Sequence, residues 1–166
     1  MTPVLRPMRW WDIDAVVLLE EELFEDAWSA EMFWNELAQA ETRTYLVLED
    51  EFGIVGYAGL AELPEAAFVQ TIGVTSSRQR EGLGRRLLAA LLRDAARRGS
   101  DEVALEVRID NLPAHRLYGS FGMTAIGVRK GYYQPSGTDA LVMSVRGVTS
   151  EEYAGRLARE PEEAVQ

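Results

Sequence analysis

The sequence contains no cysteine and only one histidine in 166 residues. Without cysteine there are no disulfide bonds, thiol nucleophiles or cysteine-ligated metals, and one histidine cannot form a multi-histidine metal site, so we expect no metal. No apolar run approaches the roughly 20 residues that span a bilayer, and MTPVLRPMRW at the start lacks the basic and apolar regions of a signal peptide. These absences predict a cytoplasmic protein without a membrane segment, whose chemistry depends on carboxylates, tyrosines or backbone groups.

Positive charge is also scarce. The chain carries 27 acidic and 17 basic side chains, a formal net charge of -10, and its first third is the most acidic part. Nonspecific nucleic-acid binding depends on neutralising phosphates, so this balance disfavours a nucleic-acid partner. An acidic surface attracts a basic partner, although it is equally compatible with simply keeping the protein in solution.

What is present is enough apolar sequence, 47% of the residues, for one folded domain without repeats or linkers. Apolar spacing and turn residues predict a short N-terminal strand, then helices within 10–24 and 28–40, and then strands within 44–50, 54–63 and 67–76. A helix from about 82 to 99, a strand at 102–109, a helix from 113 to 122, and strands at 123–133 and 139–147 are predicted to follow. This order implies an α/β domain over residues 1–148, with a mixed sheet of about seven strands and about four helices. The charged residues 149–166 form either a short helix or a tail.

Two of these elements carry the clearest periodicity. The helix after Gly82 has apolar residues at three- and four-residue steps up to the expected stop at Gly99, namely Leu83, Leu87, Leu88, Leu91, Leu92 and Ala95. The strand EVALEVRI alternates, so that Glu106 projects from the face opposite Val103, Leu105 and Val107.

The stretch RQREGLGRRLL, residues 78–88, joins a strand to that helix. Glycines at a helix start let backbone approach a ligand, and the first turn leaves unpaired N–H groups at the positive end of the helix dipole. The segment therefore fits an anion site, while a plain tight turn stays open as the alternative. A P-loop needs Gly-Lys-Ser/Thr, which is absent, and a dinucleotide fingerprint needs a third small residue where Leu87 stands.

Gln79, Gly82 and Gly84 match the pattern Gln/Arg-x-x-Gly-x-Gly/Ala, and with it the chain resembles the GNAT superfamily of N-acetyltransferases over roughly residues 3–147. LEVRIDNLPAHRLYGSFGM and KGYYQP are more specifically similar to its RimI branch, which acetylates the N-terminal amine of a small-subunit ribosomal protein. The chain departs from that branch at Gly73, Met123 and Gly131, and these differences bear more on substrate choice and packing than on the use of acetyl-CoA.

The resemblance implies the GNAT fold and acetyl-CoA as co-substrate, with the pantetheine arm beside strand 67–76 and Asn111, and the pyrophosphate on the amides before the helix. The implied cofactor-binding residues are Ile72, Gly73, Val74, Gln79, Arg80, Glu81, Gly82, Leu83, Gly84, Arg85 and Asn111. Glu106 would be the general base and Tyr118 the general acid.

Elementary chemistry is compatible with both roles. An α-amine with a pKa of about 8 loses its proton more readily than a lysine at about 10.4, so a carboxylate such as Glu106 is a sufficient base. A hydrogen bond from Tyr118 would stabilise a departing thiolate whether or not the proton is fully transferred. Spacing alone also allows Glu106 to be a solvated surface residue and Tyr118 a core residue.

The acceptor side is expected near Trp28, Tyr132 and Tyr133. Trp28 lies in a segment that resembles the family's substrate entrance, and an aromatic pair bounded by glycine and proline fits the wall of a peptide slot, although it also fits plain hairpin packing. The acidic first third favours a basic N-terminal peptide of a ribosomal protein as acceptor. A small-molecule amine as acceptor and a non-catalytic acyl-CoA-binding module remain the alternatives, and we expect a monomer or a weak oligomer.

Overall fold

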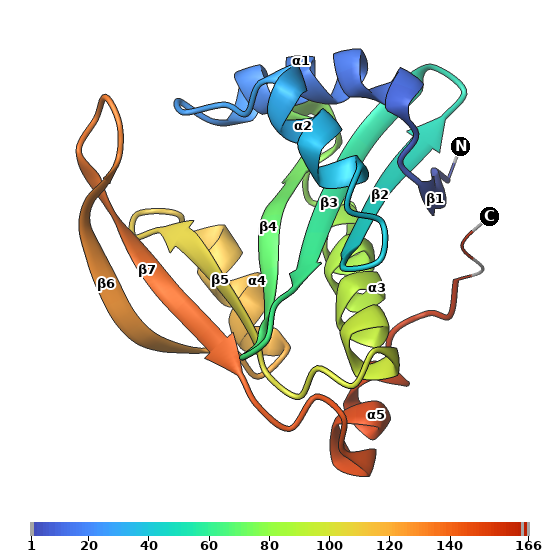
Figure 1. The fold of residues 1–166 in the computed structure, drawn as a ribbon, viewed down its shortest axis with the longest axis vertical. Coiled ribbons are helices and arrows are strands. Elements are labelled where there is room, and N and C mark those ends of the chain that lie inside the picture. The colour runs from blue at the N-terminus through green and yellow to red at the C-terminus, as the bar shows by residue number, and fades with distance from the viewer. Residues whose placement is uncertain (1, 164, 166) are drawn as a thin grey trace.

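A seven-stranded mixed sheet with helices on both faces organises the chain (Figure 1). The computed structural model describes residues 2–163 and residue 165. The strands are β1 (Val4–Pro7), β2 (Arg43–Asp50), β3 (Gly53–Glu62), β4 (Ala67–Val74), β5 (Val103–Arg108), β6 (Thr124–Tyr133) and β7 (Thr138–Val145). The helices are α1 (Ile13–Leu23), α2 (Ala30–Leu37), α3 (Leu83–Arg97), α4 (Leu112–Ser120) and α5 (Glu151–Leu157), with short 3-10 turns at Trp10–Asp12 and Ser76–Arg78. The mixed α/β class and the predicted order of elements are confirmed, with one helix more than the four expected.

The core has two halves because the central strands are buried on both faces. In β2, Tyr45 and Val47 pack with α1 and α2, whereas Leu46 and Leu48 pack with α3 on the opposite face. Alternation in a strand that is covered on both sides produces the continuous apolar run seen in the sequence. The predicted stripe of α3 is fully buried here, and the helix is followed by Gly99 at a φ of +82°, which a glycine adopts without strain.

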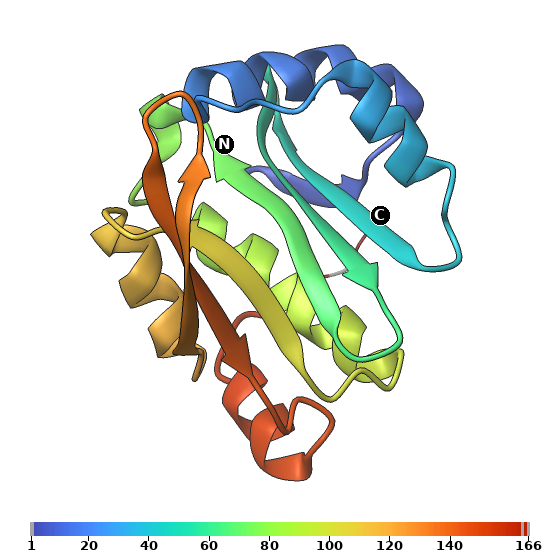
Figure 2. The ribbon, with the colours of Figure 1, turned by 60° about the vertical axis from the view of Figure 1, so that its left-hand side comes forward.

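The strand order β1-β2-β3-β4-β5-β7-β6 contains one parallel pair, β4 with β5. That pair is short, since only Ala67 with Val103 and Phe68 with Ala104 are in register. Beyond them the two strands spread apart toward their carboxyl ends, as Figure 2 shows. The sheet therefore opens at its centre while β3 and β7 hold its outer parts in place.

The fifth helix, α5, lies in the segment for which the sequence left a short helix or a tail open. Ser150 caps its N-terminus by accepting a hydrogen bond from the Tyr153 amide at 3.1 Å. Tyr153 and Leu157 are buried in the half of the core that contains α3, and the Tyr153 hydroxyl donates to the Phe121 carbonyl at 2.6 Å. No helix in the described part of the chain is both long and apolar enough to cross a membrane.

Candidate active site

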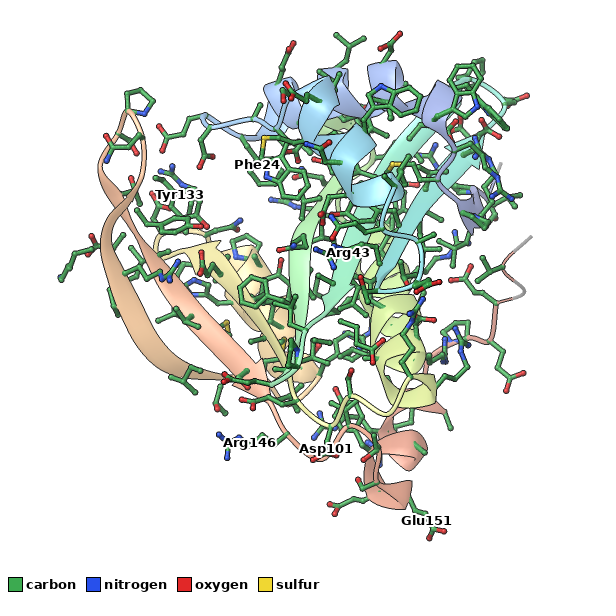
Figure 3. All side chains as sticks on the ribbon, in the orientation of Figure 1. Phe24, Arg43, Asp101, Tyr133, Arg146 and Glu151 are labelled. Atoms are coloured by element: carbon green, nitrogen blue, oxygen red, sulfur yellow. The ribbon has the colours of Figure 1, made fainter. Side chains whose placement is uncertain are left out.

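The gap between β4 and β5 opens into a cleft of about 750 Å³. Its walls come from α1 and the segment after it, from β4, from the loop before α3, and from β5, α4 and the end of β6. Figure 3 shows Phe24 and Tyr133 on opposite sides of this opening, the first from the segment after α1 and the second from β6. Segments that are far apart in the sequence thus converge where the sheet is split.

One side of the cleft is the N-terminus of α3. Gly82 is its N-cap with a φ of +78°, and no side chain caps the helix. The first bond of the helix backbone runs from the Arg86 amide to the Gly82 carbonyl at 3.1 Å, so the amides of Leu83, Gly84 and Arg85 have no helical acceptor. Unpaired amides at the positive end of the helix dipole are the geometry that an anion site requires, and the predicted anion site stays a prediction.

Side chains hold the loop before α3 in shape. Gln79 donates to the Val74 carbonyl at 3.1 Å, and Arg78 pairs with both Asp50 and Glu81. Arg80 has a φ of +67°, an uncommon value for a residue other than glycine, and it lines the cleft. The loop is therefore preorganised before any ligand binds.

Two arginines after the glycines do not present free charge to the cleft. Arg85 forms a bidentate ion pair with Glu160 and donates a hydrogen bond to Ser120 Oγ at 2.8 Å. Arg86 forms an ion pair with Glu163. Carboxylates that follow α5 therefore neutralise both guanidinium groups. In this segment, the groups that remain available to an anion are the unpaired backbone amides and the side chain of Arg80.

The edge of β4 that faces the cleft is free from the point where β5 departs. Ile72, Gly73 and Val74 pair with β3 on their other side, so their remaining backbone groups can bond an extended ligand in the manner of an added strand. Gly73 is required here because a Cβ atom would lie 2.7 Å from Leu23 Cδ1 and 2.8 Å from the Tyr57 hydroxyl. The departure from the family pattern at this position thus has a packing reason.

Three carboxylates line the cleft within the described residues: Glu20, Asp26 and Glu106. Asp26 is exposed, and Glu20 is buried among hydrogen-bond donors. Glu106 lies on β5 beside the split, with 13% of its side chain exposed. Its Oε1 atom is 2.9 Å from Nη1 of Arg129 on β6. A carboxylate in this position can take a proton from an amine that enters from the acceptor side.

Tyr118 reaches the same cleft from α4. Its side chain is buried, its hydroxyl makes no hydrogen bond to another described residue, and burial raises its pKa to about 12. The hydroxyl is thus neutral at physiological pH and free to donate to a ligand atom. Asn111, at the start of the same helix, accepts a hydrogen bond from the Ala114 amide at 3.2 Å and so caps α4 while it lines the cleft.

The sequence matches the Acetyltransferase (GNAT) family over residues 11–123. The chain belongs to this family. It is 44% identical over 131 residues to N-alpha-acetyltransferase RimI of Mycobacterium tuberculosis, a match that covers 75% of the chain and 80% of the relative. It is 29% identical over 136 residues to the ribosomal protein bS18-alanine N-acetyltransferase of Escherichia coli, covering 81% of the chain and 90% of the relative.

The architecture agrees with that family. The crystal structure of the ribosomal-protein-S18-alanine N-acetyltransferase from Escherichia coli superposes with a TM-score of 0.79 at 27% identity, covering 87% of this chain and 94% of that one. NAA60 of Arabidopsis thaliana, solved in complex with acetyl-CoA, has a TM-score of 0.78 at 17% identity, covering 87% and 98%. The predicted GNAT fold is therefore confirmed.

Most of the predicted GNAT site residues meet in this cleft. Of the eleven predicted cofactor-binding residues, only Glu81 does not line it, since its side chain turns to Arg78. Glu106 and Tyr118 line it from β5 and α4. Their roles remain predictions, because position in a cleft does not establish chemistry.

The three predicted acceptor residues also line the cleft. The Trp28 ring packs against Phe33 with ring centroids 5.2 Å apart. Tyr132 and Tyr133 stand edge to face at 5.1 Å, and the guanidinium of Arg108 lies 5.7 Å from the centroid of Tyr133. Trp28 comes from the segment after α1 and the two tyrosines come from the end of β6, and their role in holding a peptide stays a prediction.

Two groups of site residues escaped the sequence analysis. Glu20 accepts hydrogen bonds from the Trp28 amide at 3.1 Å, from Thr71 Oγ1 at 2.9 Å and from the Tyr57 hydroxyl, so it fixes Trp28 to β3 and β4. Its place in the run of glutamates 20–22 resembles any polar helix position, and no local signal distinguishes it.

The second group is a contact beside the GNAT cleft, made by Glu25 with Arg108 and Ser136. Glu25 accepts hydrogen bonds from the Ser136 amide at 3.1 Å and from Arg108 Nη1 at 2.7 Å, which joins the segment after α1 to the β6–β7 turn. The hydrogen bonds from Ser136 hold the pKa of Glu25 below its usual range, assisted by the positive charge of Arg108. The contact is therefore ionic at neutral pH.

Proposed function

We propose that this GNAT protein transfers the acetyl group of acetyl-CoA to the N-terminal α-amine of a protein, and that a small-subunit ribosomal protein of the bS18 type is its acceptor. The observation that carries the proposal is the match, over 75–81% of the chain, to relatives named as N-terminal acetyltransferases. The cleft supports it, since it joins an anion site, a free strand edge, a carboxylate and a neutral tyrosine.

The residues of the cleft divide into a cofactor half and an acceptor half. On the cofactor half, the amides of Leu83 to Arg85 suit the pyrophosphate of acetyl-CoA. The free edge of β4 at Gly73 suits the amide groups of the pantetheine arm. Acetyl-CoA supplies the activated acetyl group as a thioester.

On the acceptor half, Glu106 accepts the proton that the attacking α-amine loses. Tyr118 donates a hydrogen bond to the sulfur as the carbon–sulfur bond breaks, and its raised pKa keeps the proton available. Trp28, Tyr132 and Tyr133 hold the first residues of the peptide, and positioning of the two substrates supplies much of the rate. The net charge of -10 favours acceptors with a basic sequence.

The test is to locate the acetyl group on a peptide that offers both kinds of amine. The peptide begins with alanine, carries one internal lysine and has a basic tail, and it is incubated with acetyl-CoA and the protein before fragmentation by mass spectrometry. We expect one acetyl group on the α-amine and none on a version whose α-amine is blocked. Label on lysine alone would refute the N-terminal assignment, and turnover of small amines only would replace it with a small-molecule acetyltransferase.

A further inference from the structure

In the free protein, the carboxylate of Glu106 is already occupied by a cation from the chain itself. Nη1 of Arg129 lies 2.9 Å from Glu106 Oε1. The same guanidinium lies 5.4 Å from the ring centroid of Tyr132, whose pKa is raised by its interaction with the Glu106 carboxylate. Arg129 thus forms one cluster with Glu106 and Tyr132, two residues that line the cleft on the side where the acceptor is expected.

The irregular course of β6 brings this cluster together. Arg129 pairs with Ala140 on β7, and Glu106 pairs with Val142 on the other side of β7, so both lie over the same face. Tyr132 is three residues after Arg129 and would point to the opposite face in a regular strand. The register shifts between residues 129 and 133, and Gly131 has a φ of +61°, so the regular alternation of side chains is interrupted there. Tyr132 accordingly lies beside the Arg129 guanidinium.

Arg129 is held much more loosely than the other arginine beside the acceptor. Its side chain is 57% exposed, and Glu106 is its only ion-pair partner in the described part of the chain. Arg108, in contrast, pairs with Glu25 and Asp110 and also donates to Thr138 at 3.1 Å. Arg129 therefore has fewer contacts to give up than Arg108 when it leaves its carboxylate, and its guanidinium moves into solvent that already reaches it.

We propose that the guanidinium of Arg129 acts as a guard cation, by which we mean that it pairs with the Glu106 carboxylate until the α-ammonium group of the acceptor peptide displaces it. This inference rests on the proposed function and assigns Arg129 as a specificity-determining residue. An acceptor must bring its own positive charge to replace the guanidinium, so amines are selected over neutral acceptors such as alcohols or water.

The guard also protects acetyl-CoA from hydrolysis. Without a guard, Glu106 can take a proton from a water molecule while the water oxygen forms a bond to the thioester carbon. The carbon–sulfur bond then breaks, the sulfur leaves as a thiolate and is protonated, and the products are acetate and CoA. With Arg129 in place, the carboxylate is engaged whenever the acceptor is absent, and this side reaction is suppressed.

Kinetics of four proteins test the proposal: the wild type, Arg129→Met, Arg129→Lys and the control Lys130→Met. Lys130 is the neighbouring residue on β6, is 86% exposed, and pairs with Asp139 at 3.2 Å instead of with Glu106. Lys130→Met thus removes the same charge without freeing Glu106. Peptide KM, kcat and the release of CoA without peptide are measured for each, and thermal melting checks the fold.

We expect Arg129→Met to lower the peptide KM by about two- to fivefold, the amount that one half-exposed ion pair supplies, with kcat within about twofold. Release of CoA without peptide should rise at least about threefold. Arg129→Lys keeps the charge and should return both values to the wild-type range, and Lys130→Met should leave both unchanged.

A higher peptide KM or a tenfold lower kcat in Arg129→Met would overturn the proposal, since Arg129 would then assist the reaction. Equal changes in Lys130→Met would overturn it as well, because net charge would be the cause. If Arg129→Met does not fold, Arg129→Gln provides the charge-free comparison. Failure of the wild type to acetylate any peptide would refute the proposed function instead, and the release of CoA by Arg129→Met would still test the guard.

Discussion

Removal of the Tyr118 hydroxyl separates its role in catalysis from its role in stability. The hydroxyl has no hydrogen-bond partner among the described residues, so Tyr118→Phe leaves no polar group stranded and should change the free energy of unfolding by less than about 1 kcal/mol. A hydrogen bond to a developing thiolate is worth about 1.5–3 kcal/mol, which corresponds to a kcat lowered by roughly 10- to 150-fold. Acetyl transfer to an alanine peptide and urea unfolding measure the two quantities.

Tyr153 provides a matched control for this prediction. Burial raises its pKa to about 12 as well, but its hydroxyl donates to the Phe121 carbonyl and does not line the cleft. Tyr153→Phe should therefore cost about 0.5–1.5 kcal/mol of stability and leave kcat unchanged. The reverse pattern, a stable Tyr153→Phe with low kcat or an active Tyr118→Phe, would refute the assignment of Tyr118.

Three further outcomes follow from the packing and charge of the cleft. Gly73→Ala places a Cβ 2.8 Å from the Tyr57 hydroxyl and should lower the free energy of unfolding by about 1–3 kcal/mol, measured in urea. Gly84→Ala, whose Cβ meets only ordinary contacts, should lower it by less than about 1 kcal/mol. Equal losses in the two variants would contradict the close packing of Gly73. Because Tyr118 stays neutral, kcat should be constant between about pH 8 and pH 10. A fall in kcat near pH 10 that is absent in Tyr118→Phe would argue against a raised pKa of Tyr118. Because the pKa of Glu25 is depressed in the folded state, its stabilising contact is complete above about pH 4.5 and is lost as the pH falls further. The melting temperatures of the wild type and of Glu25→Gln should therefore differ at pH 7 and converge near pH 3. A difference that stays constant with pH would count against the contact.

The order of elements was predictable from the sequence because each signal is local. The apolar stripe of α3 depends on residues within a few helical turns, and the alternation of β5 on a few strand positions. The loop and helix start at Gly82 were predictable for the same reason, since a loop and the first turn of a helix are contiguous. The family pattern at Gln79, Gly82 and Gly84 then added the expected ligand.

The strand order and the contacts across the cleft were not predictable, because they join distant segments. β7 lies between β5 and β6, and this insertion sets Arg129 across from Glu106. The pairs of Arg85 with Glu160 and of Arg86 with Glu163 also join segments more than 70 residues apart. Such contacts depend on the tertiary fold, and no spacing rule contains them.

The central claim is that acetyl transfer takes place at the split between β4 and β5, with Glu106 as the base. The most direct measurement is kcat for an alanine peptide with Glu106→Gln, together with acetyl-CoA affinity by calorimetry. Glu102→Gln, which removes the same charge just before β5 and outside the cleft, is the control. We predict a kcat lowered about 10²- to 10⁴-fold in Glu106→Gln with unchanged acetyl-CoA affinity, and a normal kcat in Glu102→Gln. A kcat in Glu106→Gln within about threefold of the wild type would contradict the account.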